Sequence, residues 1–409
     1  MASGFYVRNA WWLGAGGLLT FASSFGQTYF IGLFAGEFRA TFGLSNGEWG
    51  TLYTVATVAS AAVLMFAGKL ADTVPLARLT GGILVAYALA ALLVSVAPHV
   101  AILCLGLAAL RFCGQGMMGL IAMTAMARWF AANRGRAVAI VILGMPVGEA
   151  LFPFLAVASI AAFGAAATWQ MAALFIAAIV LPLALILLSR QRVPLGEGAG
   201  ADTVGLHGRH WTRRDVLSHW SIWALLPGIL ASPFIGTCIF FHQVHVAEVR
   251  GFDLATMTLA FPLYAIVTVS TTLVTGAVID RIGVVRLLPI MLLPLAAAVT
   301  VLALPGGIII WFLTLAGTGL SQGIVVTMMG ALWPTLYGTR AIGSVKAIFS
   351  ASMVFSTALG PGITGLIIDA GITFPAQAGW LAVWCIVMSA LFAVIAPKLA
   401  AQLPRRQPA

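Results

Sequence analysis

Long apolar stretches follow one another along the chain, separated by short polar loops. Each is about as long as the 20 residues that a helix needs to cross the hydrocarbon core of a bilayer. Because the apolar residues run continuously, without the alternation of membrane β-strands, the pattern predicts helices. We expect twelve spans, numbered in chain order, over residues 10–34, 47–67, 79–97, 100–129, 135–161, 168–189, 221–246, 254–279, 285–304, 307–332, 342–369 and 378–397. Ser45, with Glu48 three residues on, and Asp253 are predicted to cap the starts of spans 2 and 8.

Composition indicates the same class of protein. Of the 409 residues, 61% are hydrophobic and 8% are charged, whereas a soluble domain carries about 25% charged residues. No soluble core of this size could bury so much apolar surface. The sequence therefore predicts an all-α, multi-pass membrane protein in a lipid bilayer. The cysteines lie within apolar stretches, so we expect neither disulfides nor a metal site; they are Cys104, Cys113, Cys238 and Cys385.

The basic residues are distributed unevenly between the two sides of the predicted bundle. If both termini are cytoplasmic, all 21 Lys and Arg residues lie on the cytoplasmic side except Arg39, Arg111 and Arg250. The positive-inside rule then predicts cytoplasmic N- and C-termini in a plasma membrane such as the bacterial inner membrane. This topology explains the formal net charge of +10, and no nucleic-acid partner is expected.

One charged loop occurs twice. Residues 276–286 read GAVIDRIGVVR and residues 68–78 read GKLADTVPLAR, with the glycine, the acid and the last arginine at one constant interval. Such a repeat predicts two similar halves. The polar segment 191–220 separates residues 1–190 from residues 221–409, and each half holds six spans. An even number of spans per half predicts parallel repeats, related by an axis along the membrane normal.

The repeated loop resembles the motif G-x-x-x-D-[R/K]-x-G-x-[R/K]-[R/K] between spans 2 and 3 of the major facilitator superfamily. The second copy fits this motif, whereas the first has Thr73 and Pro75 in place of the arginine after the acid and the later glycine. The segment RFCGQG, residues 111–116, resembles the fourth-span motif R-x-x-x-Q-G of the same family. The resemblance implies twelve helices in two six-helix halves and transport by alternating access, with no cofactor.

A finer resemblance involves the start of span 5. Residues 127–144, ARWFAANRGRAVAIVILG, are similar to the monocarboxylate and oxalate-formate porter branch, in which an aromatic pair precedes R-G-x-A. That branch places an arginine in span 8, whereas span 8 of this chain contains none. The similarity therefore implies a carboxylate substrate without supplying that branch's span-8 arginine.

Two charged residues lie near the middle of the predicted membrane. Arg111 is on span 4 and Glu149 is on span 5, at overlapping depths, where an unpaired charge costs about 2.5–3.5 kcal/mol on insertion scales. We expect the two side chains to face each other. In one interpretation they form a permanent ion pair that locks spans 4 and 5 together. In the other they line the transport cavity, where Glu149 carries a proton and Arg111 holds the proton-coupled state or an anionic group of the substrate.

Further polar residues lie at the depth of the predicted cavity. The neutral candidates are Gln27, Tyr29, Gln115, Tyr264 and Gln322. Gln115 shares the helical face of Arg111, and for all five both substrate contact and interhelical hydrogen bonding remain open. His242 and His245, three residues apart on span 7, are either a pH-sensing or proton-relay pair or a pair of interfacial histidines.

The family resemblance also implies a cytoplasmic gate. Asp280 would approach the inner end of span 5 near Arg134, and Asp72 would approach the inner end of span 11 near Arg340. Helix N-termini favour a carboxylate by about 0.3–1 kcal/mol. These contacts are expected to form when the inner side is shut and to break when it opens. The remaining gate residues are Arg78, Arg281 and Arg286.

The expected function is secondary active transport of a small organic solute by a monomer. The sequence lacks an H-E-x-x-H motif, a Ser-Lys pair, paired acids at membrane depth and a Walker motif, so we expect neither an enzyme nor a nucleotide-driven pump. Arg111 and the start of span 5 favour proton-coupled import of an organic anion such as a monocarboxylate. The alternatives are a neutral or aromatic metabolite or drug, moved by uniport or efflux, and a transporter-like sensor that binds without translocating.

Overall fold

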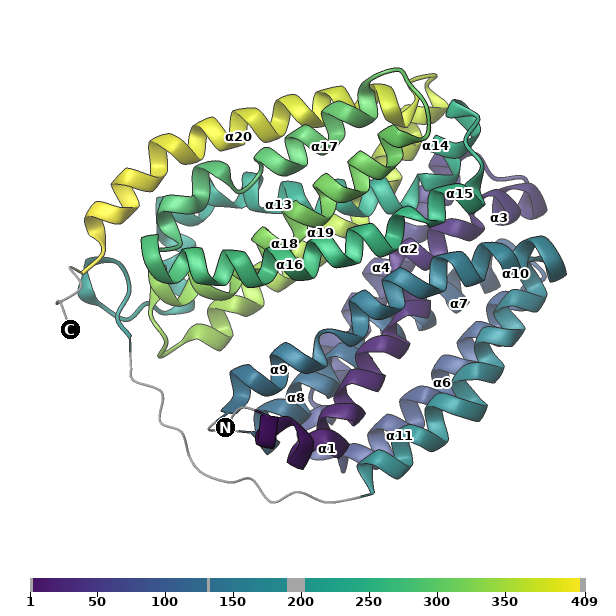
Figure 1. The fold of residues 1–409 in the computed structure, drawn as a ribbon, viewed down its shortest axis with the longest axis horizontal. Coiled ribbons are helices and arrows are strands. Elements are labelled where there is room, and N and C mark those ends of the chain that lie inside the picture. Colours follow the sequence, from purple (N-terminus) through teal and green to yellow (C-terminus); the bar gives the residue numbers. More distant parts are fainter. Residues whose placement is uncertain (1–2, 131–132, 190–202, 405–409) are drawn as a thin grey trace.

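The computed structural model describes residues 3–130, 133–189 and 203–404. These residues form long helices joined by short loops (Figure 1), which confirms the predicted all-α membrane fold. Among the described residues, eleven helical segments are long and apolar enough to cross a membrane. The longest of them, Gly135–Leu188, has 54 residues and contains two of the predicted spans.

A glycine divides this segment into spans 5 and 6. A straight helix of 54 residues would be about 81 Å long, far more than the roughly 30 Å of a hydrocarbon core. Gly164 has φ 83° and ψ 166°, a conformation that residues with a side chain rarely adopt. The hydroxyl oxygens of Ser159 and Thr168 lie 2.8 Å apart across this break, so the chain turns back on itself there. The predicted division between spans 5 and 6 is therefore confirmed.

The N-terminal half holds spans 1 to 6. Its helices are α1 (Ser3–Ala22), η1 (Ser23–Gly26), α2 (Thr28–Ile31), η2 (Gly32–Phe34), α3 (Ala35–Phe42), α4 (Asn46–Ala67), α5 (Leu70–Thr73), α6 (Leu76–Ser95), α7 (Val100–Leu110), η3 (Arg111–Met118), α8 (Gly119–Trp129), α9 (Arg134–Val141), α10 (Gly144–Phe175), η5 (Ile176–Val180) and α11 (Leu181–Leu188). Span 1 comprises α1 to α3, span 4 comprises α7 to α8, and α10 runs through the turn between spans 5 and 6.

The C-terminal half holds spans 7 to 12, preceded by the short helices η6 (Leu206–Gly208) and α12 (Arg213–Ser218). Its other helices are α13 (Trp220–Phe241), α14 (Gln243–Arg250), α15 (Leu254–Thr258), α16 (Ala260–Ile282), η7 (Val285–Ile290), α17 (Leu293–Ala303), α18 (Ile309–Tyr337), α19 (Ile342–Asp369) and α20 (Phe374–Gln402). Residues 191–202 of the predicted central segment, and residue 190 before it, lie outside the described residues. From residue 203 onward this segment packs against the end of α18, where the Trp211 backbone N–H donates to the Tyr337 carbonyl at 3.3 Å.

Two predicted helix starts are confirmed. Ser45 and Glu48 form a reciprocal capping box at the start of α4, with hydrogen bonds of 2.8 and 3.1 Å. Asp253 caps α15 by accepting hydrogen bonds from the hydroxyl and the backbone N–H of Thr256. These hydrogen bonds from Thr256 hold the pKa of Asp253 below its usual value, because they favour the ionised carboxylate.

The two halves touch at one end and diverge toward the other (Figure 1). We refer to the end where they touch as the joined end, and to the opposite end, where the described chain begins and finishes, as the terminus end. The hydrogen bonds that link described residues of the two halves come from the joined-end parts of spans 1, 2, 7 and 11. The structure therefore represents a conformation that is shut at the joined end.

Glycines allow α4 and α19 to pack closely across the joined end. A side chain at Gly50 would collide with the Pro361 carbonyl, and a Cβ at Gly365 would lie 2.5 Å from the Asn46 carbonyl oxygen. Close backbone approach of this kind is how membrane helices associate without a hydrophobic driving force. Spans 2 and 11, from opposite halves, therefore form the main seam of the joined end.

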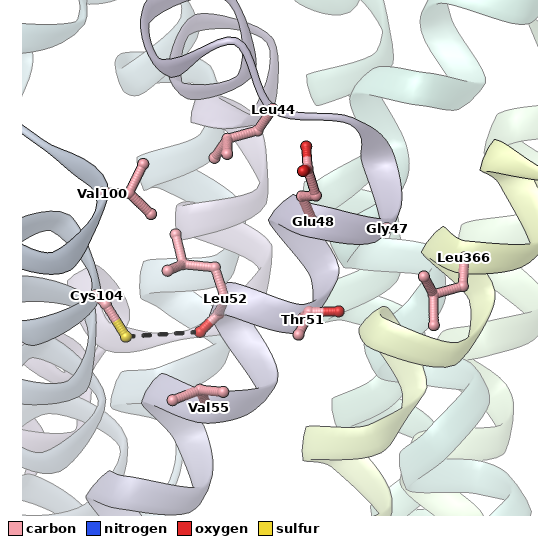
Figure 2. A pocket seen from close by; sticks show the side chains of 9 residues that line it. All are labelled: Leu44, Gly47, Glu48, Thr51, Leu52, Val55, Val100, Cys104 and Leu366. Carbon is pink, nitrogen blue, oxygen red and sulfur yellow. Dashed lines mark hydrogen bonds between the residues drawn. The ribbon is translucent and has the colours of Figure 1, made fainter.

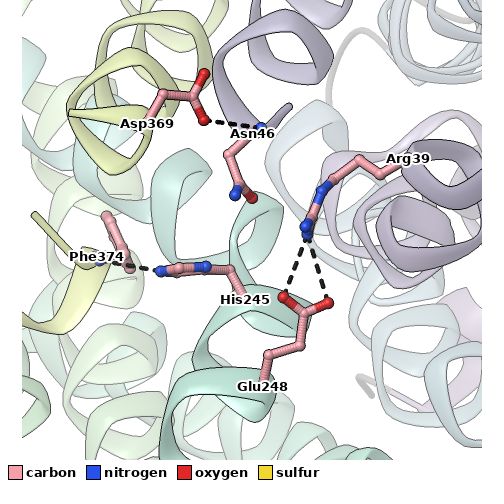
Figure 3. Close-up of polar contacts among 6 residues, drawn as sticks. All are labelled: Arg39, Asn46, His245, Glu248, Asp369 and Phe374. Carbon is pink, nitrogen blue, oxygen red and sulfur yellow. Dashed lines mark hydrogen bonds and ion pairs between the residues drawn. The ribbon is translucent and has the colours of Figure 1, made fainter. Parts of the chain in front are cut away.

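A carboxylate from the C-terminal half caps a helix of the N-terminal half (Figure 3). Asp369, the last residue of α19, accepts hydrogen bonds from the Ser45 hydroxyl at 2.6 Å and from the Asn46 and Gly47 backbone N–H groups at 3.0 and 2.9 Å. An acid opposes the dipole at the C-terminus of its own helix but complements the N-terminus of α4. We call this contact the Asp369 latch.

An ion pair lies beside the latch (Figure 3). The Arg39 Nη1 and Glu248 Oε2 atoms are 3.3 Å apart, with the two side chains 22% and 45% exposed. A pair this exposed contributes about 0.2–1 kcal/mol at most. The Asp369 latch and the glycine seam are therefore expected to hold the joined end shut more strongly than this ion pair does.

We predict that Asp369→Ala shifts the protein toward a conformation that is open at the joined end. Loss of a helix cap costs about 1 kcal/mol, which is roughly a fivefold change in the ratio of shut to open molecules. The readout is the distance between spin labels at positions 37 and 249, exposed on α3 and α14, after the native cysteines are replaced by alanine. Glu248→Gln, which breaks only the exposed ion pair, should give a smaller shift; equal shifts would contradict the ranking of the two contacts.

Candidate functional site

Span 1 is broken in the middle of the bundle. After η1, Gln27 has an extended backbone with ψ 152° before α2 begins. A break in a membrane helix leaves backbone groups that other protein groups must bond, because the bilayer supplies no partners. The Tyr87 hydroxyl donates to the Ser23 carbonyl at 3.2 Å, and Arg111 donates to the Gly26 carbonyl. Side chains from spans 3 and 4 therefore stabilise the break.

Arg111 is buried against this broken segment, with 1% of its surface exposed. Its Nη1 lies 3.2 Å from the Gly26 carbonyl oxygen and 3.4 Å from the Thr28 hydroxyl. The guanidinium carbon lies 5.1 Å from the centre of the Tyr53 ring, which makes a cation–π contact. The Nε and Nη2 groups have no hydrogen-bond partner among the described residues. Arg111 is thus a fixed cation with two unused donors.

The predicted pairing of Arg111 with Glu149 is wrong for this conformation. No ion pair joins these two described residues, and the salt bridge found among described side chains is that of Arg39 and Glu248. Arg111 is occupied by the break in span 1 and by a ring of span 2, whereas α10, the helix of Glu149, packs against α16 of span 8. The structure therefore does not contain the ion pair that was expected to lock spans 4 and 5.

Glu149 lies on α10 at the seam between the two halves. It is 6% exposed, and no hydrogen bond joins its carboxylate to another described residue. The adjacent Gly148 allows α10 to approach span 1, since a Cβ there would collide with the Ser24 hydroxyl. The carboxylate lies near enough to Tyr29 of span 1 and Tyr264 of span 8 to interact electrostatically with both. A buried acid is therefore placed where the halves meet.

Aromatic rings from both halves pack together near this position. The ring of Phe240 in α13 lies 6.3 Å from that of Tyr29, 5.7 Å from that of Phe261 and 5.2 Å from that of Tyr264, between centroids. Ring pairs in this range contribute about 0.5–1.5 kcal/mol beyond their burial. We call these four residues the aromatic wall. All four side chains are buried, so they form part of the packed seam between the halves.

The three candidate glutamines differ in exposure. Gln27 is buried, Gln322 is half-buried and Gln115 is exposed, and no side-chain hydrogen bond ties any of them to another described residue. Gln115 lies in the π-helical segment η3, and such segments occur often at functional sites. Substrate contact by these glutamines stays a prediction.

The two histidines of span 7 bond neighbouring helices within the C-terminal half. The Nε2 atom of His242 lies 2.7 Å from the Thr364 hydroxyl, and His245 Nε2 accepts the Phe374 backbone N–H at 3.4 Å (Figure 3). Both side chains are buried rather than placed at an exposed interface. These bonds favour a structural role, which joins span 7 to spans 11 and 12.

The predicted gate residues lie at the terminus end. Those with described side chains are all exposed, and none forms an ion pair with another described residue; they are Arg78, Asp280, Arg281, Arg286 and Arg340. The side chains of Asp72 and Arg134 lie outside the described residues. Because the halves diverge at this end (Figure 1), the gate contacts are not expected here, and they stay a prediction.

Two features of the structure were not anticipated from the sequence. Asp369 is the last residue of predicted span 11, but no role was assigned to it. The sequence feature that could have revealed Asp369 is an acid at the C-terminus of a helix, where the helix dipole disfavours a negative charge. The break in span 1 also has a signal, because the polar and glycine-containing run Ser23–Gln27 interrupts an apolar stretch.

Comparison with known proteins identifies the family. The sequence model described as the Major Facilitator Superfamily matches residues 16–361 and, in a second overlapping match, residues 244–409. No curated protein matches the sequence. The matched residues cover most of the chain and span both halves.

Solved structures resemble the whole fold. A bacterial homologue of the human lysosomal transporter Spinster, in an inward-facing and unoccupied conformation, has a TM-score of 0.72 at 13% identity, with 98% of this chain and 99% of that chain covered. The nucleoside transporter NupG has a TM-score of 0.66 at 14% identity, with 96% and 98% covered. At these identities the likeness establishes the fold alone. Together with the family match, it shows that the chain belongs to the Major Facilitator Superfamily and is a membrane transporter of small solutes rather than an enzyme.

Proposed function

We propose that this protein is a proton-coupled secondary transporter in which Glu149 carries the coupling proton. The observation that supports this most strongly is that Glu149 is the single buried acid among the described side chains, and it lies at the seam between halves that must move. Buried ionisable residues in membrane segments commonly belong to ion or proton pathways.

The surroundings of Glu149 link its charge to the conformation. A buried carboxylate without a hydrogen-bond donor or a cation is strongly disfavoured in its ionised form. In the shut seam, where Glu149 faces Tyr264 across the halves, the neutral and protonated acid is therefore favoured. When spans 5 and 8 separate, water reaches the carboxylate and it can release its proton. Protonation thus favours closure of the joined end, and ionisation favours its opening.

The distribution of basic residues supports an orientation for this cycle. The positive-inside rule places the terminus end in the cytoplasm, so the structure corresponds to an inward-facing conformation. The similar Spinster homologue is described as inward-facing. On this proposal, Asp280 and its partners form the complementary gate, which closes at the cytoplasmic side when the Asp369 latch releases.

The site favours a neutral or aromatic solute over an organic anion. The aromatic wall and Glu149 are contributed by both halves, and one structure with this fold is a nucleoside transporter. An organic anion remains the second candidate because Arg111 keeps two unpaired donors. Its guanidinium is already engaged by the broken span and by the Tyr53 ring, and this places the anion second, which reverses the order expected from the sequence.

We predict that Glu149→Gln uncouples transport from protons. In proteoliposomes an imposed proton gradient should drive accumulation of labelled uridine by the wild type but not by the variant, whereas exchange of uridine for uridine should persist, because glutamine keeps the shape without the titratable proton. Glu37→Gln, which neutralises an exposed acid on α3, is the matched control. Gradient-driven accumulation by Glu149→Gln would remove this residue from the coupling step.

We predict that Arg111→Gln lowers thermal stability but leaves uridine binding intact. The substitution leaves one amide to replace several guanidinium contacts with the broken span, and loss of a buried polar partner costs about 1–3 kcal/mol. Thermal-shift measurements with uridine and with L-lactate give the readout. Selective loss of a lactate-induced shift that the wild type shows would instead support the organic anion. Absence of any exchange in wild-type proteoliposomes, despite binding, would support the sensor alternative.

A further inference from the structure

A groove lies on the outside of the bundle at the joined end, apart from Glu149 and the aromatic wall. It is bounded by α4 and α7 of the N-terminal half and by α19 of the C-terminal half, with a volume of about 400 Å³ (Figure 2). This volume falls within the range of small-ligand pockets. Val55, which lines the groove, is 54% exposed on a membrane-spanning helix, so the groove is taken to open toward the lipid bilayer.

The groove changes from polar to apolar along α4. Glu48 and Thr51 line its mouth near the end of the helix, followed by Leu52 and then Val55 deeper in the membrane (Figure 2). Cys104 faces Leu52 from α7, with its sulfur 4.0 Å from the Leu52 carbonyl oxygen. This gradient matches the head-to-tail polarity of a phospholipid in the leaflet at that end.

The mouth offers one negative charge and one hydroxyl. Glu48 is exposed, and one of its carboxylate oxygens accepts the Ser45 backbone N–H. No basic side chain among the described residues pairs with it. The Thr51 hydroxyl, one helical turn further on, makes no hydrogen bond with another described residue and can donate to a phosphate or ester oxygen. The carboxylate of Glu48 and the hydroxyl of Thr51 therefore complement a lipid headgroup in which an ammonium group lies beyond a phosphate.

We propose that this groove binds one phospholipid with a primary ammonium headgroup, such as phosphatidylethanolamine. The ammonium pairs with Glu48, the Thr51 hydroxyl donates to the phosphate or an ester oxygen, and an acyl chain covers Leu52 and Val55. An anionic headgroup would be repelled by Glu48, and a choline headgroup lacks N–H donors. Headgroup preference is therefore the property that distinguishes a built site from ordinary lipid contact.

The same lipid would stabilise the shut joined end. Leu366 is the groove residue contributed by α19, and a Cβ at Gly47 of α4 would lie 2.8 Å from its side chain. Leu366 therefore stays in the groove only while α4 and α19 remain packed together. Opening of the joined end would remove one wall, so a lipid that contacts all three helices favours the shut conformation.

Native mass spectrometry of the full chain tests the site directly. The protein is mixed with equal amounts of phosphatidylethanolamine and phosphatidylglycerol that carry identical acyl chains, and the lipid retained is counted. We expect the protein to retain one phosphatidylethanolamine molecule in roughly two- to fivefold preference to phosphatidylglycerol. This is the ratio of bound lipids that the free energy of one exposed ion pair produces. Glu48→Gln should abolish this preference while it keeps the helix cap, because glutamine also completes a capping box.

Two tryptophan variants on α4 separate the groove from the general lipid surface. Val55→Trp fills the groove and should remove the retained lipid, whereas Val63→Trp, an exposed position on the same helix outside the groove, should not.

The spin-label distance between positions 37 and 249 should report more shut molecules in phosphatidylethanolamine than in phosphatidylglycerol, and this difference should vanish in Glu48→Gln. Equal retention of the two lipids by the wild type, an unchanged preference in Glu48→Gln, or equal effects of the two tryptophans would overturn the proposal.

Discussion

The absence of hydrogen-bonding partners inside a bilayer governs this structure. Every backbone polar group at membrane depth must be bonded by the protein itself or reach water. The break in span 1 meets this requirement by means of Tyr87 and Arg111, which bond the freed carbonyls of Ser23 and Gly26. The side chain of Arg111 is therefore held in place by the carbonyl group that the break in span 1 leaves free. The buried acid Glu149 is left without a cation, and this makes its protonation state sensitive to whether water reaches it.

The same constraint explains why the two halves can move. At the joined end the halves are held by glycine packing between α4 and α19 and by the Asp369 cap on α4, contacts that form over a short distance and break as a unit. Hydrogen bonds between helices in membranes contribute modestly, about 0.6 kcal/mol on average. On the proposed function, a seam held by a few such contacts opens at little cost, and a change of charge at Glu149 shifts the balance.

The sequence predicts features that depend on local pattern and fails where distant segments meet. Twelve spans and two halves follow from apolar run length and from a repeated loop, and the caps at Ser45 and Asp253 follow from adjacent residues. The facing of Arg111 and Glu149 was predicted from depth alone. The depth of a residue in the membrane does not determine the direction in which its side chain points. Arg111 points toward the break in span 1 and bonds the Gly26 carbonyl there. The Asp369 latch joins residues more than 300 positions apart, so no local pattern reveals its partner.

The most direct test of this account is the pH dependence of the joined-end distance, measured between spin labels at positions 37 and 249. If Glu149 controls the seam, lowering the pH should increase the shut population of the wild type, because the neutral acid tolerates burial. The account predicts that Glu149→Gln loses the closure at low pH. A shut population that rises with pH in the wild type, or an unchanged pH response in Glu149→Gln, would contradict it.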